Sequence, residues 1–244
     1  LFCEDTLGVG EQIVLEHEHT HYLKNVMRCK VNDRIIIFDN STGEYAAEIL
    51  NIHKRFINIE ILEKTKPICV PGDIWLIFCP LKKTRTDFLI EKSTELGLRK
   101  FLPTLSDKTQ TKTVSMARCK KNIVEAVEQC GGTFIPEILP VSSLAKVIEE
   151  LPKDRTLVFC DESLESRNIN ECLLTEKPKK AALLVGPEGG FSDSERNLFR
   201  TKKNVLPVSL GNRILRAETA AVAALTMWHG LVGDWHKRVD QQKL

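Results

Sequence analysis

The chain has 244 residues, of which 42% are hydrophobic and 28% are charged, and its formal net charge is +2. A chain of this length can bury a substantial core, in one large domain or in two moderate ones, and we favour two. The nearly neutral balance excludes any argument for nucleic-acid binding from total charge, so such a partner must be inferred from local clusters of Lys and Arg.

Eight cysteines are scattered along the chain without a C-x-x-C pair. Zinc clusters and disulfide frameworks normally show tighter cysteine spacing or an extracellular context. No stretch approaches the apolar length of a membrane span, and residues 1–5 lack the basic and hydrophobic regions of a signal peptide. We therefore expect reduced thiols in a soluble, cytoplasmic protein that does not enter the membrane.

The first third of the chain has the pattern of β-strands. Strands are expected at Arg34–Phe38, at Glu44–Ile49 and at Ile57–Ile61, and apolar and polar residues alternate strictly in the last of these. The segment Asn40–Gly43 has the composition of a turn between the first two strands. This region is predicted to form a small antiparallel barrel.

A segment with two prolines and a glycine at residues 64–73 interrupts this pattern, and strands then alternate with helices. We place the domain boundary here, with domains at 1–68 and 72–244. The expected elements of the second domain are a strand at 74–79, a helix at 85–96, a strand at 101–102, a helix at 116–130, a strand-helix pair within 136–151, and apolar runs at 156–160, 181–185 and 208–210. This succession predicts an α/β domain with a parallel sheet covered on both faces.

Two glycine-containing loops, Gly186–Phe191 and Leu210–Ala220, follow the last two apolar runs. Ligands of open α/β domains lie at the carboxyl edge of the sheet, where such loops meet. The first loop lacks the ending of a P-loop and the G-x-G-x-x-G spacing, so a nucleoside triphosphate is not expected. Its glycines permit close approach of a flat ligand, and Ser192 with Glu195 predicts a capping box. Taken alone, this loop is equally consistent with a shape that serves only helix entry.

The second loop carries Arg213 and Arg216 on either side of an apolar pair, just before a helix rich in alanine. Arginine side chains are rarely buried in a core, so the two arginines beside this glycine turn are expected to contact water, an acidic side chain or an anionic partner. Glu218, in the first helical turn, either satisfies the helix dipole or orients an arginine. The composition of this second loop indicates that the two loops form a functional site.

The two loops and several further motifs of the chain resemble those of the RsmE family of ribosomal RNA methyltransferases, and the resemblance covers essentially the whole length. The motifs that carry the resemblance are His21–Leu23, Val26–Arg28, Gly43–Tyr45, Glu91–Gly97, Glu128–Cys130, Leu184–Ser192 and Leu210–Ala220. The chain departs from the family at Gly132-Thr133, where an arginine is usual, and at Asn212 and Ala217, which replace Pro and Thr. The first departure weakens the case for an RNA contact from that loop.

The resemblance implies an N-terminal PUA-like RNA-binding β-barrel and a C-terminal SPOUT α/β domain with a trefoil knot. It also implies methylation of N3 of uridine 1498 in 16S ribosomal RNA of the small ribosomal subunit, with S-adenosylmethionine as cofactor and a homodimer as the active unit. The residues expected to bind the cofactor are Gly186, Pro187, Glu188, Gly190, Leu210, Gly211, Ile214 and Leu215.

Methylation at N3 requires loss of the imide proton and alignment of the nitrogen with the donor methyl. We expect Arg216 to stabilise the uracil anion, and Arg213 to position RNA or the donor carboxylate. Glu218 is expected to orient Arg216 or to assist proton removal. The basic residues expected to contact RNA phosphates are Lys24, Arg28 and Arg34 in the first domain and Lys82, Lys83 and Arg85 in the second. For each lysine alone, a solvated surface is the stronger interpretation, and only the set supports RNA binding.

Alternatives remain at two points. His17, His19 and His21 would lie on one side of a strand as metal ligands, but Glu16 and Glu18 interleave them and no fourth ligand is evident, so we expect no metal. A catalytically silent RNA-binding or ribosome-assembly protein would keep the barrel and the basic surface. A SPOUT methyltransferase that acts on another RNA site is the second alternative.

Overall fold

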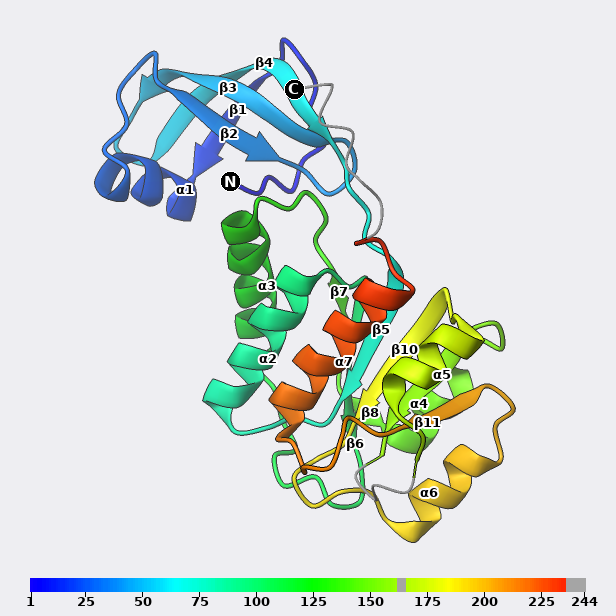
Figure 1. Ribbon diagram of the computed structural model, residues 1–244. Helices are drawn as coiled ribbons and strands as arrows, with labels where there is room; N and C mark the ends of the chain where they lie inside the picture. The colour runs from blue at the N-terminus through cyan, green and yellow to red at the C-terminus, as the bar shows by residue number, and fades with distance from the viewer. Residues whose placement is uncertain (162–165, 236–244) are drawn as a thin grey trace. The chain divides into compact units, whose positions relative to one another are not determined.

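The computed structural model describes residues 1–161 and 166–235 (Figure 1). They form two compact units: Leu1–Val70 with Val127–Ile135, and Pro71–Ala126 with the described residues from Pro136 onward. The division after Val70 lies between the two domains expected from the sequence. The return of the chain to the first unit at Val127–Ile135 has no signal in the sequence pattern. One contact of this segment is the hydrogen bond that the Cys69 N–H donates to Thr133 Oγ1 over 2.8 Å.

The first unit contains an antiparallel sheet of four strands. They are β1 (Gln12–Glu16), β2 (Arg34–Phe38), β3 (Gly43–Ile52) and β4 (Phe56–Pro67), in the spatial order β1-β4-β3-β2. Alternate residues of β4 enter the core, since Ile57, Ile59 and Ile61 are fully buried, and three register shifts interrupt the pairing of β3 with β4. This confirms the predicted antiparallel β-domain, because period-two alternation buries one face of each strand.

The three histidines are not on a strand, and this expectation is wrong. Strand β1 ends at Glu16, and His17 to His21 form the short helix α1, which continues into a π-helical turn, η1 (Tyr22–Val26). Successive helical residues are rotated by about 100°, so His19 points to the side opposite His17 and His21. In the part of the chain that the structure describes, no group of three His, Cys, Asp or Glu side chains is placed to hold a metal ion.

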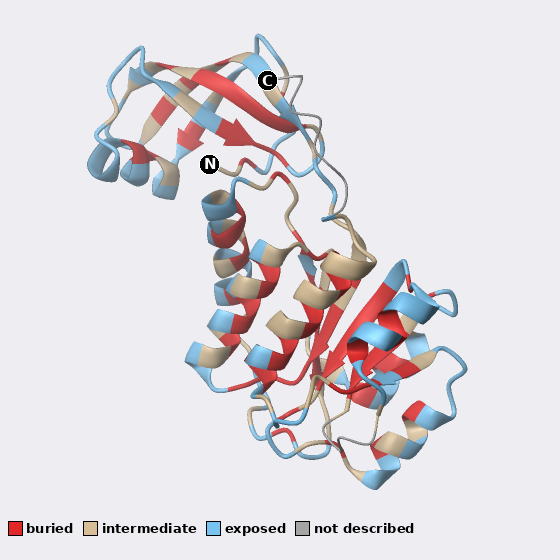
Figure 2. Cartoon of the chain, viewed as in Figure 1, coloured by how far each residue is buried: buried red, intermediate tan, exposed pale blue. Residues whose placement is uncertain are grey.

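The second unit is built on a parallel sheet, which confirms the predicted α/β domain. Its strands are β5 (Asp73–Phe78), β6 (Lys100–Leu105), β7 (Glu137–Ile138), β8 (Ser142–Ser143), β9 (Thr156–Cys160), β10 (Lys180–Val185) and β11 (Val205–Val208). The spatial order is β11-β9-β10-β5-β6-β7, with β8 paired to β6. The central strands β5 and β10 are almost wholly buried (Figure 2), as continuous apolar runs in a parallel sheet require.

Helices cover both faces of this sheet. They are α2 (Lys83–Leu96), α3 (Met116–Cys130), α4 (Leu144–Glu150), α5 (Ile169–Glu176), α6 (Asp193–Arg200) and α7 (Ala217–Leu231). Helix α7 lies alongside α2 and also packs against α5 and β10, while α4 packs against α6 (Figure 1). Within the described ranges, no helix has the length and apolar character needed to cross a membrane.

The last strand lies earlier than expected, at Val205–Val208 instead of 208–210. It tolerates Pro207 because, in the sheet of the described residues, it is an edge strand paired with β9. Ser209 and Leu210 therefore already belong to the loop. Because β11 lies at the edge and α7 packs against β10, the chain must cross the carboxyl ends of β9 and β10 between them. The trefoil threading itself stays a prediction from the resemblance.

Candidate functional site

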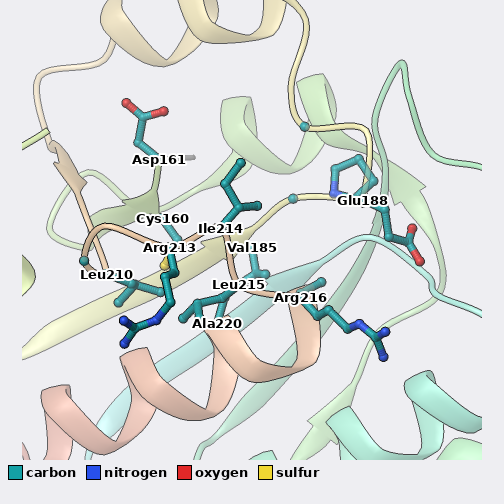
Figure 3. A pocket seen from close by; sticks show the side chains of 15 residues that line it. Cys160, Asp161, Val185, Glu188, Leu210, Arg213, Ile214, Leu215, Arg216 and Ala220 are labelled. Carbon is teal, nitrogen blue, oxygen red and sulfur yellow. The ribbon is translucent and has the colours of Figure 1, made fainter. Parts of the chain in front are cut away.

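The crossing after β11 brings the two glycine-containing loops together around one pocket (Figure 3). The pocket is lined by Cys160, Asp161, Val185, Gly186, Pro187, Glu188, Gly190, Leu210, Gly211, Arg213, Ile214, Leu215, Arg216, Ala217 and Ala220. All eight residues proposed from the sequence as cofactor-binding are among them. Two of the three proposed catalytic residues, Arg213 and Arg216, are there as well.

The first loop is shaped by the ring of Phe191. A Cβ at Gly186 would lie 2.6 Å from this ring, which is far inside van der Waals contact. The ring is 3% exposed and packs edge-on against Phe159 and Phe199, each with a centroid distance of 5.2 Å. A turn closes the loop, in which the Gly190 N–H donates to the Pro187 carbonyl over 2.9 Å. The backbone from Gly186 to Gly190 therefore packs against the Phe191 ring on one side and lines the pocket on the other.

Helix α6 begins directly after this loop, and the predicted capping box is confirmed. The Glu195 N–H donates to Ser192 Oγ over 3.3 Å, and the Ser192 N–H donates to Glu195 Oε2 over 2.8 Å. The loop after β6 supports the same corner, since the Asp107 N–H donates to Glu195 Oε1 and Lys108 Nζ donates to the Phe191 carbonyl. These bonds satisfy backbone groups that the helix start leaves unpaired.

The second loop places apolar and cationic side chains at the pocket. Gly211 has a φ of +108°, a conformation that favours glycine. Ile214 lines the pocket with 78% of its surface exposed, which leaves an apolar side chain facing solvent at a concave site. Ala217 and Ala220 line the start of α7, where small side chains permit close packing. Figure 3 shows the guanidinium groups of Arg213 and Arg216 pointing to different ends of the pocket.

Glu218 does not pair as expected. Its side chain is buried, and Oε1 lies 3.7 Å from Nε of Arg85 on α2. No ion pair joins Glu218 to Arg216 in the described ranges. Arg216 occupies the extended N-cap position of α7, whereas Glu218 lies within the first turn of a helix that packs against α2. Sequence spacing suggested the neighbouring arginine, but helix packing selects one that is distant in the chain.

Sequence reasoning did not propose five of the pocket residues. Ala217 and Ala220 lie in the second loop, whereas Cys160, Asp161 and Val185 come from elsewhere in the chain. The last three end β9 and β10 or follow directly, so the carboxyl-edge rule applied to these two apolar runs would have found them. Burial raises the pKa of the Cys160 thiol to about 12, so this side chain is a neutral part of the wall and not a nucleophile. Asp161 accepts hydrogen bonds from Arg196 Nη1 over 2.6 Å and from Ser166 Oγ over 2.9 Å.

The proposed RNA contacts fall into two groups. Lys24, Arg28 and Arg34 are exposed in the first unit, and Lys82 and Lys83 are exposed at the start of α2. Arg85 differs from them, because its Nη1 donates to Glu188 Oε1 over 3.0 Å. Five of the six side chains are therefore open to an anionic partner, while the sixth is engaged with carboxylates.

Comparisons with known proteins agree with this geometry. The chain matches a family model described as an RNA methyltransferase domain over residues 69–229, and another described as an RNA methyltransferase PUA domain over residues 16–62. It is 35% identical to the ribosomal RNA small subunit methyltransferase E of Buchnera aphidicola subsp. Schizaphis graminum, with 96% of each chain covered. It is 29% identical to the protein of the same name from Rickettsia conorii, with 92% of each chain covered.

Solved structures give the same result. The ribosomal RNA small subunit methyltransferase E from Neisseria gonorrhoeae, bound to S-adenosylmethionine, superposes with a TM-score of 0.87 at 27% identity, covering 96% of this chain and 98% of that one. A Legionella pneumophila protein described as a methyltransferase, in complex with the same cofactor, also gives a TM-score of 0.87, at 28% identity with 96% and 97% coverage.

Proposed function

This chain belongs to the family of ribosomal RNA small subunit methyltransferases E, and from that premise we propose that it methylates N3 of uridine 1498 in 16S ribosomal RNA with S-adenosylmethionine as donor. The observation that carries the proposal is the meeting of the two glycine-containing loops in one pocket. Loops separated in the fold, or a hollow filled by the chain's own side chains, would have argued against a donor site.

The residues of the pocket suit this donor. Its walls are mostly apolar, and Gly186 and Gly211 are held where a side chain would clash or strain the backbone, so main-chain groups are open to a flat heterocycle. The exposed Ile214 is the apolar surface that such a ring would cover. When bound, S-adenosylmethionine supplies a methyl group on a positively charged sulfur. Arg213 is the cation we assign to its carboxylate or to RNA.

The chain's own residues supply positioning and charge. We assign to Arg216 the stabilisation of the negative charge that develops on uracil as its imide proton is lost. Glu218 is a carboxylate held close to the pocket, and we keep it as the candidate acceptor for that proton. Holding both reactants in one orientation accounts for much of the rate of such a transfer.

RNA binding is assigned to the exposed cations, Lys24, Arg28, Arg34, Lys82 and Lys83. Phosphate contacts of this kind supply strength and salt dependence, whereas the target base must leave its stack to reach the donor. We further propose a homodimer as the active unit and, because the substrate is ribosomal RNA, a cytoplasmic location.

Two measurements test the proposal. Calorimetric titration of S-adenosylmethionine into the purified protein should show binding, and its absence would favour a non-catalytic RNA-binding protein. Mass mapping of 16S ribosomal RNA from cells that lack the gene should show loss of one methyl group at N3 of uridine 1498. Loss of a methyl group at another nucleotide or atom would keep the chemistry and replace the substrate.

A further inference from the structure

Arg85 connects helix α2 to both loops of the pocket. Its Nη1 lies 3.0 Å from Oε1 of Glu188, which lines the pocket in the first glycine-containing loop. Its Nε lies 3.7 Å from Oε1 of Glu218, which follows the second loop in the first turn of α7. One guanidinium therefore stands between a carboxylate of the first loop and a carboxylate at the start of α7, directly after the second loop.

The burial of these groups strengthens the electrostatic contact between Arg85 and Glu218. The side chain of Arg85 is 31% exposed and that of Glu218 is 11% exposed, so the second contact is partly shielded from solvent. The other oxygen of Glu218, Oε2, is buried and has no hydrogen-bond partner among the described residues. A buried carboxylate without donors is costly unless a cation lies beside it. Arg85 is the cation that meets this need.

The charges around Arg85 argue against its binding an RNA phosphate. One guanidinium beside two carboxylates leaves a local charge of −1, which does not attract a phosphate. By contrast, Lys82 and Lys83, on the same end of α2, are exposed. The planar fork of an arginine can engage two acceptors at once, which a lysine ammonium does less well.

We propose that Arg85 is a positioning residue of the methyl-transfer site: it holds Glu188 and Glu218, and thereby both loops, in the arrangement that binds the donor and orients the reacting groups. The inference rests on the proposed function for its catalytic part. Its structural part, the joining of the two loops, is independent of which RNA is methylated.

The test compares Arg85→Ala with the wild-type protein in three measurements. Donor affinity by calorimetry should weaken about fivefold, as expected when a partly exposed ion pair is lost. The kcat for methyl transfer should fall at least about tenfold, because the truncation leaves Glu218 buried without its cation. RNA affinity and its salt dependence should not change. Arg85→Lys, which keeps the charge but not the fork, should recover part of kcat, and it serves as the reporter if the alanine variant folds poorly.

A double-mutant cycle separates positioning from general damage. If Arg85 acts through Glu218, Arg85→Ala should lower kcat much less in a Glu218→Gln background than in the wild type. Arg99→Ala is the matched control: Arg99 is 38% exposed, lies 3.9 Å from Asp73, and precedes β6 at the opposite edge of the sheet. It should change neither donor affinity nor kcat.

The outcomes are distinct. Unchanged donor affinity and kcat in Arg85→Ala, with weaker RNA binding and a shallower salt dependence, would overturn the inference and make Arg85 a phosphate contact. Additive effects in the double-mutant cycle would also overturn it. If the wild-type protein binds the donor but methylates no RNA, the proposed function fails, and weakened donor binding by Arg85→Ala still supports the joining of the loops.

Discussion

The ring of Phe191 occupies the space in which a side chain at Gly186 would lie, with 2.6 Å between the ring and the position of a Cβ. The ring is held by two other aromatic side chains and cannot move aside freely. This relationship determines the path of the backbone where it leaves β10 and faces the pocket, and it leads to the first prediction.

Gly186→Ala should displace the first loop and weaken binding of S-adenosylmethionine at least about tenfold. Forcing a methyl group against a packed ring costs about 1–3 kcal/mol of unfolding free energy. Calorimetry and thermal unfolding measure both effects. Gly230→Ala is the control, because a Cβ at that position in α7 meets nothing within 4 Å. Equal donor affinity in the two variants would show that the Phe191 contact does not shape the site.

Asp39 should make the first unit sensitive to acid. The side chain is 1% exposed and accepts hydrogen bonds from the N–H groups of Leu7, Ser41, Thr42 and Gly43 and from the Thr42 hydroxyl. Burial alone favours the protonated acid, but these donors outweigh it and hold the pKa of Asp39 well below its usual range. The stabilisation is therefore present above the unfolded pKa of about 3.9 and is lost as pH falls below it toward the lower folded value.

Urea unfolding at neutral pH and near pH 3 checks this expectation. Asp39→Asn should lower the free energy of unfolding at neutral pH by about 1–3 kcal/mol, since an amide cannot accept all of these bonds. It should also lose less stability than the wild type on acidification. Asp33→Asn, in an exposed turn of the same unit, is the control and should behave like the wild type in acid. A parallel acid response in all three proteins would contradict the assignment.

Arg216→Ala should reduce the single-turnover rate of methyl transfer by about a hundredfold, the usual effect of removing one donor to a developing anion. Donor affinity should change little if the role of Arg216 is toward the uracil. Arg200→Ala, an exposed arginine in the last turn of α6, provides the control for loss of a surface charge. An undiminished rate would remove Arg216 from the chemistry.

The pair Lys24→Ala and Arg28→Ala should weaken RNA binding and flatten its dependence on salt. Each lost phosphate contact lowers the slope of log affinity against log salt by about 0.7–0.9. Fluorescence anisotropy over a KCl series measures this slope. Lys146→Ala, whose side chain is 62% exposed on α4 beside Glu150, should leave the slope unchanged. An equal loss in this control would mean that the effect is non-specific.

Several features of this protein could be predicted because they are encoded by residues close together in the chain. Alternation in Ile57–Ile61 predicts which side chains of β4 are buried, and the pair Ser192 and Glu195 predicts the start of α6. The two glycine-containing loops stand out for the same reason. Short-range patterns failed at two places: His17–His21 is helical, and β11 begins earlier than its apolar run suggests.

The sequence by itself determined the class of fold, the two loops and the family to which they belong. Only the tertiary structure decided which groups meet. Glu218 lies beside Arg85 of α2, which is distant in the chain, and not beside the adjacent Arg216. Such contacts depend on how α7 packs against α2 and on where the chain crosses the sheet. The packing of α7 against α2 results from many weak contacts over the whole domain, and it cannot be inferred from any short stretch of residues.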